Sequence, residues 1–193
     1  MTRKLYMLAA FALAACGGEA PPPAAAPAVE GAWNVDKAAS RVEFSGTQTG
    51  KAFTGAFEEF DATIVFDPAD LVAARIEAVI DTNSAKTGDR QRDAALPGAE
   101  WFSVKAFPDA RFVSETIAAT GDGAYEARGR LSIRGVEREI VLPFTLAIAG
   151  DRATADASLT LNRAEYAVGQ GEFATDKWVA FDVKVAIHIE ATR

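Results

Sequence analysis

The chain has 193 residues, of which 49% are hydrophobic and 24% are charged, and its formal net charge at pH 7 is −7. This length and composition predict one folded domain, and they exclude a disordered chain or a polytopic membrane protein. The acidic balance argues against a nucleic-acid partner, and one Cys with one His excludes an internal disulfide and the usual zinc sites, so we expect no metal and no required cofactor.

Residues 1–15 have the organisation of a bacterial lipoprotein signal peptide. Arg3 and Lys4 precede an apolar stretch, residues 5–13, that is too short to span a bilayer, and the segment Leu13-Ala14-Ala15-Cys16 ends it. The resemblance to a lipobox implies that Cys16 is lipidated and becomes the new N-terminus. An ordinary secretory signal with an incidental Cys is the alternative.

Residues 16–30 are rich in Pro and Ala and predict a tether. Pro favours an extended polyproline II path of about 3.1 Å per residue, so this segment has a reach of roughly 40 Å from a membrane surface. Gly17 follows Cys16 where, in enterobacterial sorting, an Asp retains a lipoprotein at the inner membrane. We therefore expect a lipid-anchored protein on the periplasmic face of the bacterial envelope, with the outer membrane favoured.

Residues 31–193 form the predicted domain, in which apolar and polar residues alternate as in strands with one solvated face. The longest alternating runs are 125–134 and 179–190, and shorter ones cover 41–45, 62–66, 75–81, 139–146 and 153–161. Tight hairpins need positive φ, which three pairs supply: Asp122-Gly123, Arg134-Gly135 and Gly150-Asp151. About eight strands predict an antiparallel all-β fold, either a closed barrel or a sandwich.

Two long connections interrupt this pattern. In the first, residues 82–110, a polar segment at 88–96 predicts a short helix that Pro97-Gly98 stops, and Trp101, Phe102 and Phe107 follow. The second, residues 162–177, holds Tyr166 and Phe173. These aromatic side chains either plug one end of a barrel or form the wall of a ligand entrance.

Small residues on the inward faces favour a barrel with internal space. Ala127 and Gly129 share one face of a predicted strand, and Ala153, Ala155 and Ala157 share one face of another. An eight-stranded barrel is near the size at which either side chains or one elongated ligand fill the interior. A tapering, fully packed core is the alternative.

From Trp33 to the C-terminus, the chain resembles the YceI-like family, whose members are periplasmic lipocalin-like barrels that bind polyisoprenoid lipids. The motifs appear in the family's order: Trp33-x-Val35-Asp36, Ser40-x-Val42-x-Phe44, Gly55-x-Phe57 and Phe60, Ile64-x-Phe66-Asp67, Thr87 with Arg92-Asp93-x-x-Leu96, Trp101-Phe102, Phe107-Pro108-x-Ala110-x-Phe112, Gly129-x-Leu131-Ser132-Ile133-Arg134-Gly135-Val136, and Asn162-Arg163-x-x-Tyr166. The chain departs from the family at Ala95, where His is frequent, and at Tyr166-Ala167, where Phe-Gly is frequent.

The resemblance implies an antiparallel eight-stranded barrel, with one or two short helices in a long loop, that holds an isoprenoid lipid such as a polyprenyl phosphate or a quinone tail. The side chains expected to form the wall of the pocket are Phe44, Phe57, Ile64, Phe66, Ile76, Phe112, Leu131, Leu142, Phe144, Leu161 and Phe181. Plain core packing is the alternative for each of them. A homodimer is left open.

A second group of side chains is expected at a lid or at the barrel mouth: Arg92, Asp93, Trp101, Phe102, Phe107, Arg163 and Tyr166. Arg92 and Asp93 either support the loop through ion pairs or, in the case of Arg92, meet a lipid head group, because a guanidinium suits phosphate. Arg163 is the other candidate for the head group.

The sequence contains no clear set of catalytic residues. His188 lies on the polar face of the last predicted strand, and Asp182, on the same face, is about 20 Å away at the usual strand rise. A general base needs an adjacent nucleophile and an orienting group, so we expect no catalysis. The rival to a lipid carrier is a tethered interaction module that contacts an envelope or redox partner and holds no lipid.

Overall fold

The computed structural model describes residues 31–193. The predicted signal peptide, Cys16 and the tether lie outside this range. Within the described part, no helix is long and apolar enough to cross a membrane.

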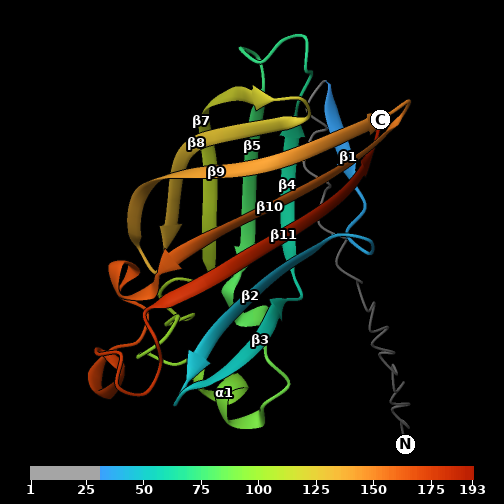
Figure 1. The fold of residues 1–193 in the computed structure, drawn as a ribbon. Helices are drawn as coiled ribbons and strands as arrows, with labels where there is room; N and C mark the ends of the chain where they lie inside the picture. Colours follow the sequence, from blue (N-terminus) through green and yellow to red (C-terminus); the bar gives the residue numbers. More distant parts are fainter. Residues whose placement is uncertain (1–30) are drawn as a thin grey trace, which may run out of the picture.

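Eight antiparallel strands close into a barrel (Figure 1). Their order around the ring is β1 (Ala32–Val35), β4 (Phe60–Val65), β5 (Arg75–Asp81), β7 (Asp109–Gly121), β8 (Ala124–Ile133), β9 (Val136–Ala149), β10 (Arg152–Asn162) and β11 (Asp182–Thr192). Residues 191 and 192 of β11 pair with β1 and thereby close the ring. The barrel and its short helices confirm the fold that the sequence predicts.

Three further strands extend the wall near the long loops. β2 (Arg41–Gln48) pairs with residues 184–188 of β11, β3 (Lys51–Phe57) pairs with β2, and β6 (Ala85–Lys86) pairs with β3. β11 therefore has β1 beside one end and β2 beside the other. β2 and β3 thus continue the barrel wall toward α1 (Arg90–Ala95), which lies at the bottom of Figure 1.

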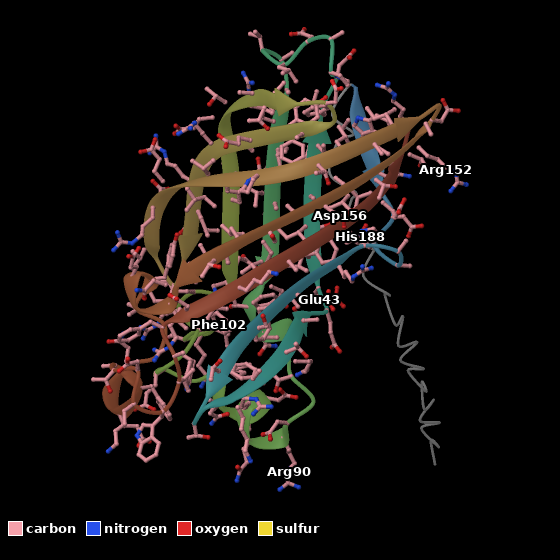
Figure 2. All side chains as sticks on the ribbon, in the orientation of Figure 1. Glu43, Arg90, Phe102, Arg152, Asp156 and His188 are labelled. Carbon is pink, nitrogen blue, oxygen red and sulfur yellow. The ribbon has the colours of Figure 1, made fainter. Side chains whose placement is uncertain are left out.

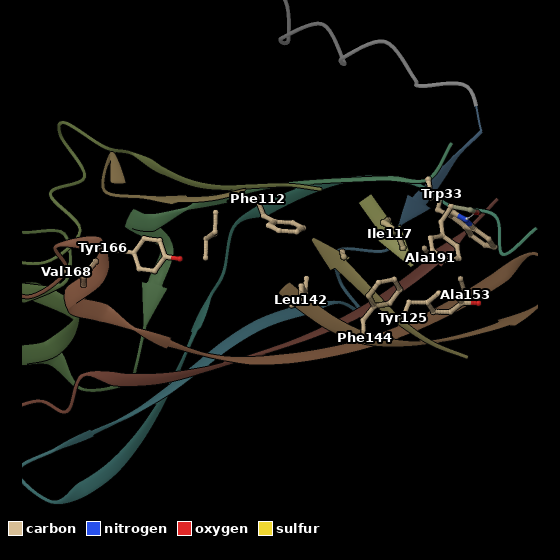
Figure 3. Packing of buried hydrophobic residues seen from close by; sticks show 14 residues of the cluster. Trp33, Phe112, Ile117, Tyr125, Leu142, Phe144, Ala153, Tyr166, Val168 and Ala191 are labelled. Atoms are coloured by element: carbon tan, nitrogen blue, oxygen red, sulfur yellow. Dashed lines mark hydrogen bonds between the residues drawn. The ribbon is translucent and has the colours of Figure 1, made fainter. Parts of the chain in front are cut away.

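Aromatic side chains close the barrel at the end away from α1. The Trp33 indole nitrogen donates to the Phe66 carbonyl at 2.9 Å, and the Phe66 ring meets the Tyr125 ring edge-on at 5.1 Å between centroids. Tyr125 in turn stacks on Phe144 at 5.4 Å. Figure 3 shows this cluster at one end of the interior and Tyr166 at the other. The core is thus concentrated at the closed end.

The longest strand that the alternation misses is β7, the second longest in the barrel. Its buried positions are Ala110, Phe112 and Ser114, and then Ile117, because a β-bulge shifts the register between Ser114 and Thr116. A bulge inserts one residue and moves the later side chains to the opposite phase. The period-two pattern is therefore broken in the middle of the strand.

The turn residues behave as their sequence predicts. Gly123, Gly135 and Gly150 all have positive φ, and Arg134 joins Gly135 with a φ of 51°. Gly129 has a different reason to be Gly, since a Cβ there would lie 2.2 Å from the Val113 carbonyl oxygen. Gly129 therefore permits close approach of β7 and β8, and the sequence-based interpretation that it leaves internal space is wrong.

Candidate functional site

The barrel interior contains an apolar inner chamber of about 200 Å³. Inward residues of the ring strands form its wall, and three of them are the small side chains Ala153, Ala155 and Ala157 of β10. Nine of the predicted wall residues line it: Phe57, Ile64, Phe66, Ile76, Phe112, Leu131, Leu142, Phe144 and Leu161. Ala127 is fully buried in the core cluster and does not line the chamber.

An outer chamber of about 390 Å³ lies between the barrel and the two long connections. Phe44, another predicted wall residue, lines this chamber. Phe57, Phe102, Ile133, Leu161 and Val185 line both chambers, so the two spaces adjoin. The Phe57 and Phe102 rings meet edge-on at 5.8 Å between centroids, at the junction. Figure 2 places Phe102 near the loop end of the barrel.

Phe181 does not line either chamber, contrary to the sequence-based prediction. The alternation places it on an inward face of a strand that starts at residue 179, whereas β11 begins at Asp182. Phe181 belongs instead to the connection, where its ring centroid lies 5.3 Å from the guanidinium carbon of Arg163.

The helix α1 brings a polar cluster to the outer chamber. Asp89 caps its N-terminus by accepting from the amides of Gln91 and Arg92 at 2.9 and 3.0 Å. Asp93 accepts from the amide and the hydroxyl of Thr87, both at 2.7 Å. These hydrogen bonds lower the pKa of both carboxyl groups below the ordinary value. Asp89 and Asp93 thus hold the loop in place.

Arg92 lies in the outer chamber wall and is hydrogen-bonded through two of its three nitrogens. Its Nε donates to the Thr87 hydroxyl at 3.2 Å and its Nη1 to the Gln48 side-chain oxygen at 3.0 Å, and its guanidinium carbon lies 4.7 Å from the Phe53 ring centroid. Its side chain is 26% exposed. Sequence reasoning predicts Arg92 here but misses Gln48 and Phe53, because only the fold brings the β2–β3 hairpin beside α1.

Arg163 is buried and is fully engaged with backbone. Its guanidinium donates to five carbonyl oxygens between 2.7 and 3.0 Å, and these belong to Val168, Phe173, Thr175, Val179 and Ala180. Desolvation lowers the pKa of Arg163 from its ordinary value. The residue lines the outer chamber, but its N–H groups fasten the 163–181 connection and are not free for a head group.

The predicted aromatic lid is only partly at the mouth. Trp101, Phe102 and Tyr166 line the outer chamber, and the Trp101 ring lies 5.0 Å from the Phe173 ring. Phe107 is 37% exposed and lines neither chamber. Its ring instead covers Gly135 on the β8–β9 turn, where a Cβ would lie 2.6 Å from it. The prediction for Phe107 is therefore wrong.

His188 has an orienting carboxylate that the sequence does not reveal. Asp156 stands directly opposite on β10, and its Oδ1 lies 2.8 Å from His188 Nδ1 (Figure 2). Glu190 Oε1 lies 3.4 Å from the other ring nitrogen. The sequence argument considers only one strand and so misses a neighbour across the ladder. His188 and Asp156 lie outside the lining of both chambers.

No group of three or more metal-ligating side chains gathers among residues 31–193.

Comparisons with known proteins identify relatives of this architecture. BcnA of Burkholderia cenocepacia has a crystal structure with a TM-score of 0.80 and 34% sequence identity, over 82% of this chain and 100% of that one. A UPF0312 protein of Pseudomonas putida is 29% identical over 151 residues, which are 75% of this chain and 78% of the relative.

A polyisoprenoid-binding domain from Saccharophagus degradans has the same fold, with a TM-score of 0.65 at 17% identity, over 83% of this chain and 97% of that one. The YceI-like domain family matches residues 33–191, which is almost the whole of the described barrel. The chain therefore belongs to the YceI-like family.

Proposed function

We propose that this protein binds an isoprenoid-type lipid inside its barrel, with the hydrocarbon chain in the inner chamber and the polar end in the outer chamber. The observation that carries the proposal is a wall of apolar side chains around an interior that small β10 residues keep open. The polyisoprenoid-binding domain of the same fold supports the class of ligand. A polyprenyl phosphate and a quinone both fit this description.

The energetics of such binding follow from the chemistry of the wall. Burial of apolar surface contributes about 25 cal/mol per Å², so a long prenyl chain binds tightly without polar recognition of its tail. Among residues 31–193, the charged and amide side chains that line a chamber all belong to the outer chamber, where Arg92, Gln48 and Thr87 meet. We infer a carrier function and no catalytic one.

Trp101 provides a test of the outer chamber as the route of the lipid. Replacing it with Ala (W101A) removes part of the chamber wall and should speed the dissociation of a fluorescent prenyl lipid roughly five- to tenfold. W178A is the matched control, because Trp178 is 41% exposed and lines neither chamber. Dissociation rates and melting temperatures are measured for both. A lower melting temperature with unchanged release would show that the loop is only a plug.

We also propose that the protein is anchored through Cys16 to the periplasmic face of an envelope membrane. The lipobox-like segment and the Pro-rich residues after it support this proposal. The variant C16S should accumulate as an uncleaved or soluble precursor, because no thiol accepts the lipid. The wild-type protein should partition into detergent with a lipid-sized mass increment on Cys16. Mature, unmodified wild-type protein in the soluble fraction would contradict the anchor.

A further inference from the structure

Tyr166 carries a hydroxyl that no residue from 31 to 193 hydrogen-bonds. The residue as a whole is only 2% exposed, and its side chain borders the outer chamber. A hydroxyl that borders a chamber and has no protein partner is available to a ligand as a donor. Tyr166 ends η2 (Arg163–Tyr166), and its side chain lines the outer chamber. In Figure 3 its hydroxyl points along the barrel interior, on the side of Phe112.

Three other polar side chains around the outer chamber, those of Thr87, Gln48 and Arg163, are already engaged by the protein. The Thr87 hydroxyl donates to Asp93, the Gln48 oxygen accepts from Arg92, and Arg163 is bonded to five carbonyls. Trp101, Phe102 and Leu161 line the same chamber and supply no hydrogen-bond acceptor from their side chains. The Tyr166 hydroxyl is therefore a free donor on an otherwise apolar stretch of the wall.

We propose that Tyr166 donates a hydrogen bond to an oxygen atom at the polar end of the bound lipid, and that this bond selects oxygen-bearing prenyl lipids over pure hydrocarbons. This inference rests on the proposed lipid-binding function. The shared chemistry is an acceptor oxygen, which a quinone carbonyl, a polyprenol hydroxyl or a phosphate provides. The position of Tyr166 also sets the orientation of the lipid in the barrel. Its polar end lies beside η2, and its hydrocarbon tail extends toward Trp33.

The state of the phenol agrees with a donor role. Desolvation raises the pKa of Tyr166 above its ordinary value, so the hydroxyl is protonated at neutral pH. A hydrogen bond to a neutral acceptor in such a site discriminates roughly three- to tenfold against a ligand that lacks the acceptor. A hydrocarbon ligand would cover the Tyr166 hydroxyl without giving it a hydrogen-bond acceptor. The desolvation of that hydroxyl therefore weakens the binding of the hydrocarbon.

The test compares Tyr166→Phe with the wild-type protein after delipidation. The probes are squalene, which is a hydrocarbon, and a polyprenol, a quinone and a polyprenyl phosphate of similar chain length. Tyr125→Phe is the matched control, because Tyr125 is also a buried tyrosine but lines neither chamber. Dissociation constants and melting temperatures are recorded for each protein.

Tyr166→Phe should weaken the oxygen-bearing lipids roughly three- to tenfold relative to squalene, with an unchanged melting temperature. Tyr125→Phe should leave the ratio unchanged. Comparison of the three oxygen-bearing probes shows which acceptor Tyr166 prefers. An unchanged ratio in Tyr166→Phe, or a lower melting temperature with no change in the ratio, would overturn the inference. If the wild-type protein binds neither squalene nor the other probes, the proposed function itself fails.

Discussion

Replacing Arg163 with Met (R163M) should lower the free energy of unfolding by about 3–5 kcal/mol, which corresponds to a fall in melting temperature of roughly 6–20 °C. The guanidinium is 4% exposed and donates to five carbonyl oxygens of one connection. Met fills similar space but leaves these acceptors without donors. Urea denaturation followed by circular dichroism measures the change.

Two variants make this result interpretable. R163K keeps the charge but has three donors on one nitrogen, so it should recover only part of the loss. R128M removes an exposed arginine whose partner is Glu126 at 3.4 Å, and it should change stability by less than about 0.5 kcal/mol. An R163M protein within about 1 kcal/mol of wild type would show that the connection does not depend on Arg163.

Replacing Ala155 with Leu (A155L) should at least halve the lipid that the purified protein carries, while the free energy of unfolding changes by less than about 1 kcal/mol. Ala155 faces inward on β10, opposite Leu146 and Ile189, and lines the inner chamber. The added carbons occupy space that a prenyl chain would fill. Extraction of bound lipid and thermal unfolding measure the two effects.

Ala127 offers the matched control for this substitution. It is 0% exposed and lies in the packed core cluster, outside the lining of the inner chamber. A127L should overpack the core and cost about 1–3 kcal/mol, with the lipid content of the folded fraction unchanged. If A155L destabilises as much as A127L and loses no lipid, the interior near Ala155 is solid core.

Much of the barrel was predictable because strand periodicity and turn chemistry are local. Gly135 needs positive φ whatever surrounds it, and the alternation along β8 follows from burial of one face. β7 was missed since its bulge changes the phase between Ser114 and Thr116. Phe181 was misplaced because the alternation continues past the true start of β11.

The chemistry of the site depends on contacts between distant segments, which one sequence cannot reveal. The sequence predicts Arg92 and Arg163 as equivalent candidates for a head group. The fold separates them. Arg163 donates to five carbonyl oxygens through all three of its nitrogens, whereas the hydrogen bonds of Arg92 within residues 31–193 use only Nε and Nη1. The pairing of His188 with Asp156 likewise exists only because β10 and β11 are neighbours.

The most direct test of lipid binding is native mass spectrometry of the full-length wild-type protein purified from cells in mild detergent. We predict a folded protein with one additional non-covalent mass that chloroform extraction releases and identifies as an isoprenoid lipid. A folded protein that carries no such mass, and that acquires none when it is mixed with polyprenol or quinone, would contradict the account and favour the interaction module that holds no lipid.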